Sequence, residues 1–227
     1  MDASAKTPAL IETLIRKGTL KQDIYETTLQ AFKTFKQVIR EIVEENRDAV
    51  NMADKRISLE YRDKTDFEVE MKFAGDVLIF LMHTNIFEFS RDHEVMKTAY
   101  IREDAKRSYC GMITIFNFLA DSFKYNRMND VGYMIGRIFV NREKHYFLEG
   151  KREVGRLYHN FSTSELNVNS IREIVESAML YSINFDLLTP PYDDMKLVTV
   201  SEMQVTIENM PLKTGKRLGF RFNADPD

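Results

Sequence analysis

Apolar and polar side chains alternate strictly in two stretches between residues 57 and 73, and this alternation constrains the fold more than any other feature of the chain. Positions 57, 59 and 61 are apolar with polar neighbours, and the pattern returns from Phe67 to Phe73 after the turn residues Asp63-Lys64-Thr65. Because successive side chains of a strand point to opposite faces, the pattern predicts an antiparallel hairpin with one apolar and one solvated face. Gly75-Asp76 supplies the next turn, and the apolar run from Val77 to Met82 predicts a third strand, buried on both faces.

Helical signals dominate the first fifty residues. Thr7 is a favourable N-cap, Pro8 suits the first helical position, and Gly18 offers a left-handed stop, so a short first helix is expected. A capping-box pattern then opens at Thr19, and apolar residues continue at helical spacing as far as Arg47. We therefore expect a second, long helix from Thr19 to Arg47.

The second half of the chain mixes both periods. The segment from Ser108 to Tyr125 contains a strand-like Ile-Thr-Ile-Phe, but its polar residues recur at helical spacing, so we interpret it as a mostly buried helix. Positions 132–140 and 145–149 predict a hairpin that turns at 141–144. Ser170 and Glu173 form a capping-box pair that predicts a helix extending to Phe185, with a stop at 189–191. Residues 196–207 and 217–222 predict a last pair of strands.

This order of elements indicates an α+β fold with a largely antiparallel sheet, helices on one face and a long N-terminal helix. We expect a single domain over residues 1–227, with a helical part at 1–50 and a sheet-containing core at 51–227. The arrangement resembles the style of PAS-like and GAF-like sensor domains, which often carry a long flanking helix that dimerises. A fold of this style does not by itself fix a function.

Composition narrows the classes of protein. The single cysteine, Cys110, cannot form an internal disulfide, which favours a reducing compartment. The polar start of the chain has no signal-peptide pattern, and the longest stretch without a charged residue, from Ser108 to Ala120, is too short to span a bilayer. The net charge of −3 argues against nucleic acid as a partner. We therefore expect a soluble, cytoplasmic protein that binds no membrane.

The residues that common chemistries need are scattered or missing. The four histidines lie far apart in the sequence at 83, 93, 145 and 159, and neither a Gly-rich phosphate loop nor a Gly-x-Ser-x-Gly elbow is present. Our first hypothesis is therefore a non-catalytic binding or scaffold module, sensor-like, that binds a protein partner or a small ligand and needs no metal or cofactor. Whether the chain is an enzyme stays open, with the balance against it.

A metal-dependent nuclease or phosphodiesterase is the first alternative. Glu70-Met71-Lys72 resembles the Glu-x-Lys element of a nuclease fold whose active site lies on a hairpin, and Asp66 or Asp63 offers an upstream carboxylate. In such a site the carboxylates hold Mg²⁺ and the lysine orients the attacking water. The ordinary interpretation is a solvated strand face, because Asp66, Glu70 and Lys72 fall on the polar side of the alternation. On that interpretation the Glu70 side chain is exposed.

An anion or nucleotide binder is the second alternative. Between residues 97 and 160 the chain has twelve Lys and Arg against seven Asp and Glu, while the flanking segments are acidic. The candidate ligand-binding residues are Arg137, Arg142, Lys144, Lys151 and Arg152. Arg137 lies in a strand that is apolar on both faces, so it needs either an internal carboxylate, with Asp121 and Glu149 as candidates, or an anionic ligand. The opposing interpretation is that the basic and acidic segments neutralise one another.

The long helix also suggests an oligomer. Its later turns carry Val38, Ile42 and Val43 beyond the stripe that one sheet can cover. We therefore predict a homodimer, or a protein partner, held through the helix from Thr19 to Arg47.

Overall fold

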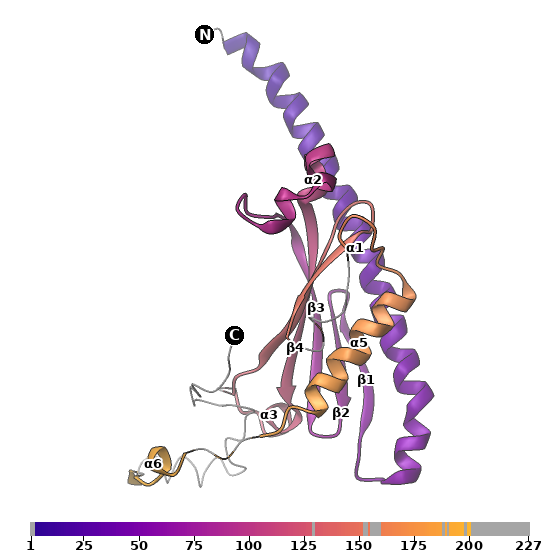
Figure 1. Cartoon of the computed structure of the whole chain (residues 1–227), viewed down its shortest axis with the longest axis vertical. Helices are drawn as coiled ribbons and strands as arrows, with labels where there is room; N and C mark the ends of the chain where they lie inside the picture. Colours follow the sequence, from indigo (N-terminus) through magenta and orange to yellow (C-terminus); the bar gives the residue numbers. More distant parts are fainter. Residues whose placement is uncertain are drawn as a thin grey trace.

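The computed structural model of the chain describes residues 3–128, 130–151, 154, 160–187, 189, 191–197 and 199–200. A long helix, α1 (Ala3–Ala53), precedes a six-stranded antiparallel sheet in which every strand pairs with its neighbour in the sequence (Figure 1). The sheet is followed by a second packed helix, α5 (Val168–Ile183), and a single turn, α6 (Tyr192–Met195). The strands are β1 (Leu59–Thr65), β2 (Glu68–Phe73), β3 (Asp76–Glu88), β4 (Tyr109–Leu119), β5 (Tyr133–Val140) and β6 (Tyr146–Gly150). The predicted α+β class, with a largely antiparallel sheet and a long N-terminal helix, is confirmed.

The core lies between one face of the sheet and the two long helices. Phe32, Phe35 and Ile39 of α1 are fully buried there, and α5 contributes Ile171 and Ile174 beside them. The strands present every second residue to this core, as the alternation predicts. We call this side of the sheet the inner face and the opposite side the outer face.

The predicted break between two N-terminal helices is absent, because α1 runs continuously through Gly18 and Thr19. A glycine inside a helix costs only about 1 kcal/mol relative to alanine. That is less than the loss of several backbone hydrogen bonds at a helix end. The stop signal at Gly18 is therefore overridden by the strong helical sequence on both sides.

The interpretation of residues 108–125 as a helix is wrong. The segment forms the central strand β4, followed by the short helix α3 (Ala120–Lys124). Its polar residues lie at helical spacing for other reasons: Asn117 donates a hydrogen bond to Asp76 at 3.1 Å on the inner face, and Thr114 is buried on the outer face between Leu81 and Arg137. The segment is a strand because it pairs with β3 on one edge and with β5 on the other, and this pairing decides its structure in spite of the helical spacing of its polar residues.

One end of the outer face is covered by the link between β3 and β4. This link folds over the sheet as three short helical turns: η1 (Glu94–Lys97), α2 (Ala99–Glu103) and η2 (Ala105–Ser108). The turns and the sheet enclose a second apolar cluster that includes Tyr100, Phe139 and Phe161.

Three further predictions meet different outcomes. The hairpin is confirmed as β5 and β6, but α5 begins three residues earlier than predicted: Asn167 is its N-cap, and Ser170 completes the capping box in place of Glu173. The predicted last strand pair lies almost wholly in residues 201–227, outside the described residues, and the described positions between 196 and 200 form no strand. Within the described part of the chain, no helix combines the length and apolar character needed to cross a membrane.

Candidate functional site

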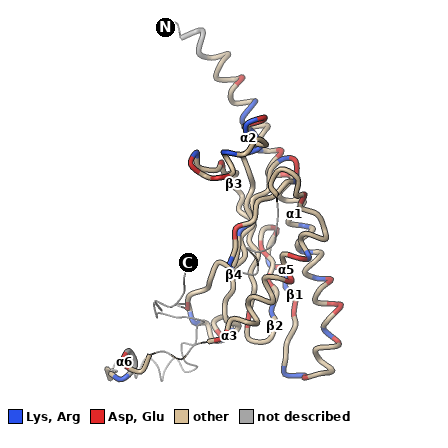
Figure 2. Tube along the Cα trace, in the orientation of Figure 1, with Lys and Arg blue, Asp and Glu red and all other residues tan. Residues whose placement is uncertain are grey.

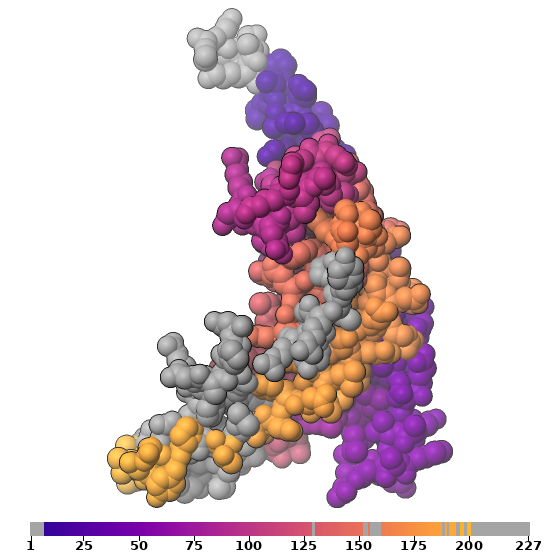
Figure 3. Space-filling model, viewed as in Figure 1, coloured from indigo at the N-terminus to yellow at the C-terminus, as the bar shows by residue number. Residues whose placement is uncertain are grey.

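Residues 7–18 of α1 project beyond the rest of the described chain (Figures 1 and 3). We call these residues the arm. Four large apolar side chains of the arm are exposed: Leu10 by 67%, Ile11 by 50%, Leu14 by 68% and Ile15 by 63%. They form a stripe along one side of the helix, because positions one, three, four and five apart cluster on one side of an α-helix. An exposed apolar stripe of this kind is unusual for a free surface.

The arm stripe overlaps one edge of the core-facing side of α1. Leu14 precedes the buried Phe32 by eighteen residues, which is five full helical turns, so these two side chains lie on the same side of the helix. Ile11 precedes the buried Leu20 by nine residues, which is about two and a half turns, so these two lie on opposite sides. The stripe therefore begins on the core-facing side of α1 and extends around the helix beyond it.

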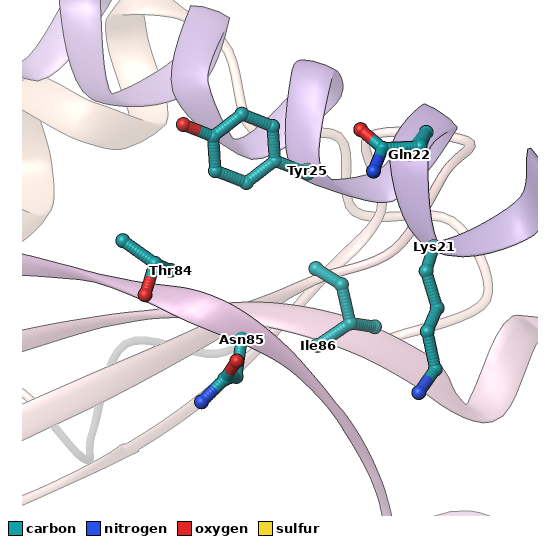
Figure 4. A pocket seen from close by; sticks show the side chains of 6 residues that line it. All are labelled: Lys21, Gln22, Tyr25, Thr84, Asn85 and Ile86. Atoms are coloured by element: carbon teal, nitrogen blue, oxygen red, sulfur yellow. The ribbon is translucent and has the colours of Figure 1, made fainter. Parts of the chain in front are cut away.

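A pocket of about 410 Å³ lies at the foot of the arm, between α1 and β3 (Figure 4). Tyr25 and Gln22 form its helix side, and Ile86 points toward the helix from the strand side. Tyr25 follows Leu14 by eleven residues, about three turns, so the two lie on the same side of α1. The stripe and this pocket therefore form one continuous surface. The remaining lining residues are Lys21, Thr84 and Asn85.

An irregularity in the sheet creates this pocket. His83 pairs with Met112 and Phe87 pairs with Cys110, so three residues of β3 stand opposite Gly111 alone. The extra residues leave the regular ladder as a bulge. At Gly111 the sheet meets α1 closely, because an added Cβ atom would lie 2.0 Å from the Thr28 hydroxyl. The close contact at Gly111 and the bulge beside it fix where α1 separates from the sheet.

The arm and its foot carry an excess of positive charge. Arg16, Lys17 and Lys21 are exposed beside the stripe, against the single carboxylate of Glu12 between residues 7 and 21. Elsewhere charges of both signs are interspersed along α1 and over the strands (Figure 2). The surface is therefore apolar along its centre and basic at its edge.

The three residues of the proposed nuclease site lie on β2 and in the turn before it. Glu70 and Lys72 lie on the outer face of β2, as predicted, and Asp66 lies in the β1–β2 turn. Lys72 donates a hydrogen bond to Glu60 of β1 at 3.1 Å. Among the described residues, no group of three or more His, Cys, Asp or Glu side chains is arranged to hold a metal ion.

The expectation that Glu70 is exposed is wrong. Only 8% of its side chain is exposed, and its oxygens lie 3.5 Å from Lys64 and 4.0 Å from Arg62. The face assignment was right, since Met71 is fully buried on the inner face. The outer face, however, is hollowed at this point, and long basic side chains cover the carboxylate.

Arg137 is paired with one of the two carboxylates suggested by its sequence context. Its Nε atom donates to Glu149 on the neighbouring strand β6, and its guanidinium lies 5.2 Å from the centre of the Phe139 ring. The second carboxylate oxygen of Glu149 is 3.4 Å from Nε2 of His93, the N-cap of η1. The Arg137 side chain is 41% exposed, so the outer side of β5 is only partly covered.

The other basic candidates are spread along the β5–β6 hairpin. Arg142 pairs with Asp104 at 2.7 Å, and Lys144 is exposed in the turn with a left-handed backbone. Lys151 is exposed beyond the opposite end of β6, and Arg152 lies outside the described residues. Because a strand rises about 3.3 Å per residue, the turn and Lys151 are roughly 20 Å apart. The structure does not bring the described members of this set together.

The apolar residues that suggested a dimer are covered within the chain. Val38, Ile42 and Val43 all belong to the core formed with α5 and the sheet. The residues that are exposed instead belong to the arm, which the sequence prediction treated as an ordinary short helix. The sequence held one signal of this exposure: the apolar positions change to another side of the helix between Leu14 and Leu20.

Comparison of the chain with protein-family models, with curated proteins and with solved structures finds no significant match. The style shared with PAS-like and GAF-like domains therefore stays an analogy.

Proposed function

We propose that the chain is a non-catalytic binding module that docks onto a protein partner through the arm and the pocket at its foot. The observation that carries this proposal is the exposed stripe of Leu10, Ile11, Leu14 and Ile15. Complete burial of one such side chain is worth about 1.5–3 kcal/mol. Four of them on one preformed helix supply the anchors of a helix-in-groove complex.

The basic edge of the arm indicates the chemistry of the partner. Arg16, Lys17 and Lys21 favour an apolar groove with acidic side chains at its rim, because complementary charges orient and accelerate docking. A partner of this kind could also bury the pocket walls at Tyr25 and Ile86. We infer a protein groove, acidic at the edge and apolar at the base.

A second copy of the chain fits this surface less well, because two arms would bring their basic edges together. The homodimer through the helix from Thr19 to Arg47 stays an untested prediction, and its apolar residues are already covered by α5.

The proposed setting is the cytoplasm. The single thiol, Cys110, is buried under the η1–η2 segment, and burial raises its pKa, so it behaves as an inert apolar side chain. A module with one buried thiol needs no oxidising compartment to fold.

The test places a photo-crosslinking amino acid at position 14 of the full chain, with position 180 of α5 as a control. Leu180 is exposed by 56%, comparable to Leu14 at 68%. The protein crosslinked at position 14 is then identified, purified and titrated against the unmodified chain. We expect Leu14→Asp to weaken this binding about tenfold or more, since a buried leucine is worth more than 1.4 kcal/mol. Leu180→Asp should leave it unchanged.

Three results would contradict the proposal. Crosslinks from position 14 to a second copy of the chain would show self-association. Binding of the arm to vesicles of anionic lipid, lost in Leu14→Asp, would show a membrane-surface helix instead. Equal effects of the Leu14 and Leu180 substitutions would show that the arm is not the docking element.

A further inference from the structure

The outer face of the sheet holds a second hollow, far from the arm. This outer pocket has a volume of about 640 Å³. It is lined by residues of β1, β2, β3 and the turn between β2 and β3, and by α3 and Leu187 on its other sides. Figure 1 shows α3 at the opposite end of the molecule from the arm. The pocket is independent of the docking surface proposed above.

Basic side chains dominate the charged lining of the outer pocket. Five Lys and Arg residues line it, against two acidic residues, Glu70 and Asp121. The five basic residues are Arg56, Arg62, Lys64, Lys72 and Lys124. Such an excess in a concave surface focuses a positive potential that attracts anions.

Arg56 is paired with Asp54 at 2.6 Å, but the pairing of the other cations leaves part of their charge available. Arg62 and Lys72 share the carboxylate of Glu60, at 2.6 and 3.1 Å. Lys64 has Glu70 as its partner at 3.5 Å, longer than the 2.7–2.9 Å typical of a strong charged hydrogen bond. Two cations on one carboxylate, and a long pair beside them, are not neutralised within the pocket.

Glu70 positions this basic cluster. Its side chain is nearly buried at the base of the pocket, and it faces Lys64 and Arg62 from the middle strand. A carboxylate at this depth holds the two longer side chains over the opening. It thereby directs their charges toward a ligand at the pocket mouth.

The apolar walls limit the class of ligand. Phe123 and Leu187 are about half exposed, and Val77 forms the base beside them. An inorganic anion would use only the basic side and leave these apolar walls wet. A ligand that joins an anionic group to an aryl or acyl body would use both.

We propose that the outer pocket binds a small amphiphilic anion: a carboxylate, sulfonate or phosphate group on an apolar body. The anionic group lies at the pocket mouth, on the solvent side of Lys64 and Arg62 and away from the Glu70 carboxylate, and the apolar body lies against Phe123 and Leu187. This site adds a ligand to the binding module and does not depend on the arm.

The probe is anilinonaphthalene sulfonate, which joins a sulfonate to an aromatic body and fluoresces when its surroundings are apolar. It is titrated into Leu14→Asp protein, so that the arm does not contribute to binding. We expect saturation at one probe per chain, with shifts of the backbone amide signals of Lys64, Glu70 and Phe123 in nuclear magnetic resonance spectra. Lys64→Glu should weaken binding about tenfold or more, equivalent to 1.4 kcal/mol.

Matched variants separate the two halves of the site. Lys33→Glu makes the same charge change on α1, where Lys33 is exposed on the other side of the molecule, and should leave the affinity unchanged. Phe123→Ala should weaken binding of the probe but not of inorganic phosphate. Equal losses in Lys64→Glu and Lys33→Glu would overturn the proposal, and so would probe affinity that Phe123→Ala leaves intact. Melting curves of each variant report that it is folded.

Discussion

At the scale of single residues, Tyr100 links the cover of the outer face to the β5–β6 turn. Its hydroxyl donates to Glu143 at 2.8 Å and accepts from the Asn141 side-chain amide at 2.8 Å, while Arg107 lies over its ring. Burial raises the pKa of Tyr100 to about 12, because the charged phenolate would be poorly solvated there. Neither the ring nor its partners formed a recognisable motif, since the residues are about forty positions apart.

This environment predicts a stability difference that depends on pH. Tyr100→Phe removes one hydrogen-bond partner from Asn141 and one from Glu143, and should cost about 1–3 kcal/mol at neutral pH. The pKa of Tyr100 is raised from 10.0 to about 12 in the folded protein. The stability that the protonated hydroxyl contributes is therefore present in full below pH 10, and it is lost as the pH rises through 12. The gap between wild type and Tyr100→Phe should therefore shrink above pH 10. Urea unfolding of both proteins at neutral pH and near pH 11 measures it, and a constant gap would mean that the hydroxyl is solvated.

Among the elements, α1 contains a residue that often ends helices, Gly18, and yet continues through it. Gly18 continues the helix with open space around it, so Gly18→Ala gains helix propensity without a clash. A gain of about 1 kcal/mol should slow amide exchange in residues 7–17 about fivefold. If Gly18 instead ended a helix in the left-handed conformation, alanine would speed this exchange. Hydrogen exchange followed by mass spectrometry on both proteins distinguishes the two cases by the sign of the change.

The elements differ in how well the sequence predicts them, for physical reasons. The alternation in β1 and β2 survives because one of their faces carries the core and the other carries charged groups. In β4 both faces are mostly apolar, so the period disappears, and Thr114 and Asn117 fall three apart by coincidence. Only the pairing of Asn117 with Asp76 explains a polar residue there, and a contact between strands is invisible in a local window.

The candidate site shows the same limit. The stripe of Leu10, Ile11, Leu14 and Ile15 is legible in the sequence as one side of a helix. Its exposure depends on where the sheet ends, and that is set by the bulge opposite Gly111. The outer pocket was missed because its basic residues come from the link before β1, from β1 and β2, and from α3, which the sequence does not place together.

At the scale of the whole molecule, the two proposed surfaces lie at opposite ends of the sheet (Figure 1). α1 reaches one of them directly, and the β1–β3 meander forms most of the other. A partner on the arm would leave the outer pocket open, so both could be occupied at once. The architecture favours a module that joins a protein partner to a small anion without competition between them.

The whole-molecule prediction concerns the oligomeric state. Val38, Ile42 and Val43 are covered by α5 and the sheet, and the basic edges of two arms would repel each other. We therefore expect the purified protein to sediment with the mass of one chain at micromolar concentration, and Leu14→Asp to sediment in the same way. A mass of two chains that Leu14→Asp returns to one would assign the arm to self-association and remove the case for a different partner. A dimer that persists in Leu14→Asp would instead require an interface on another surface, and crosslinking from positions 14 and 180 would then show which helix lies in it.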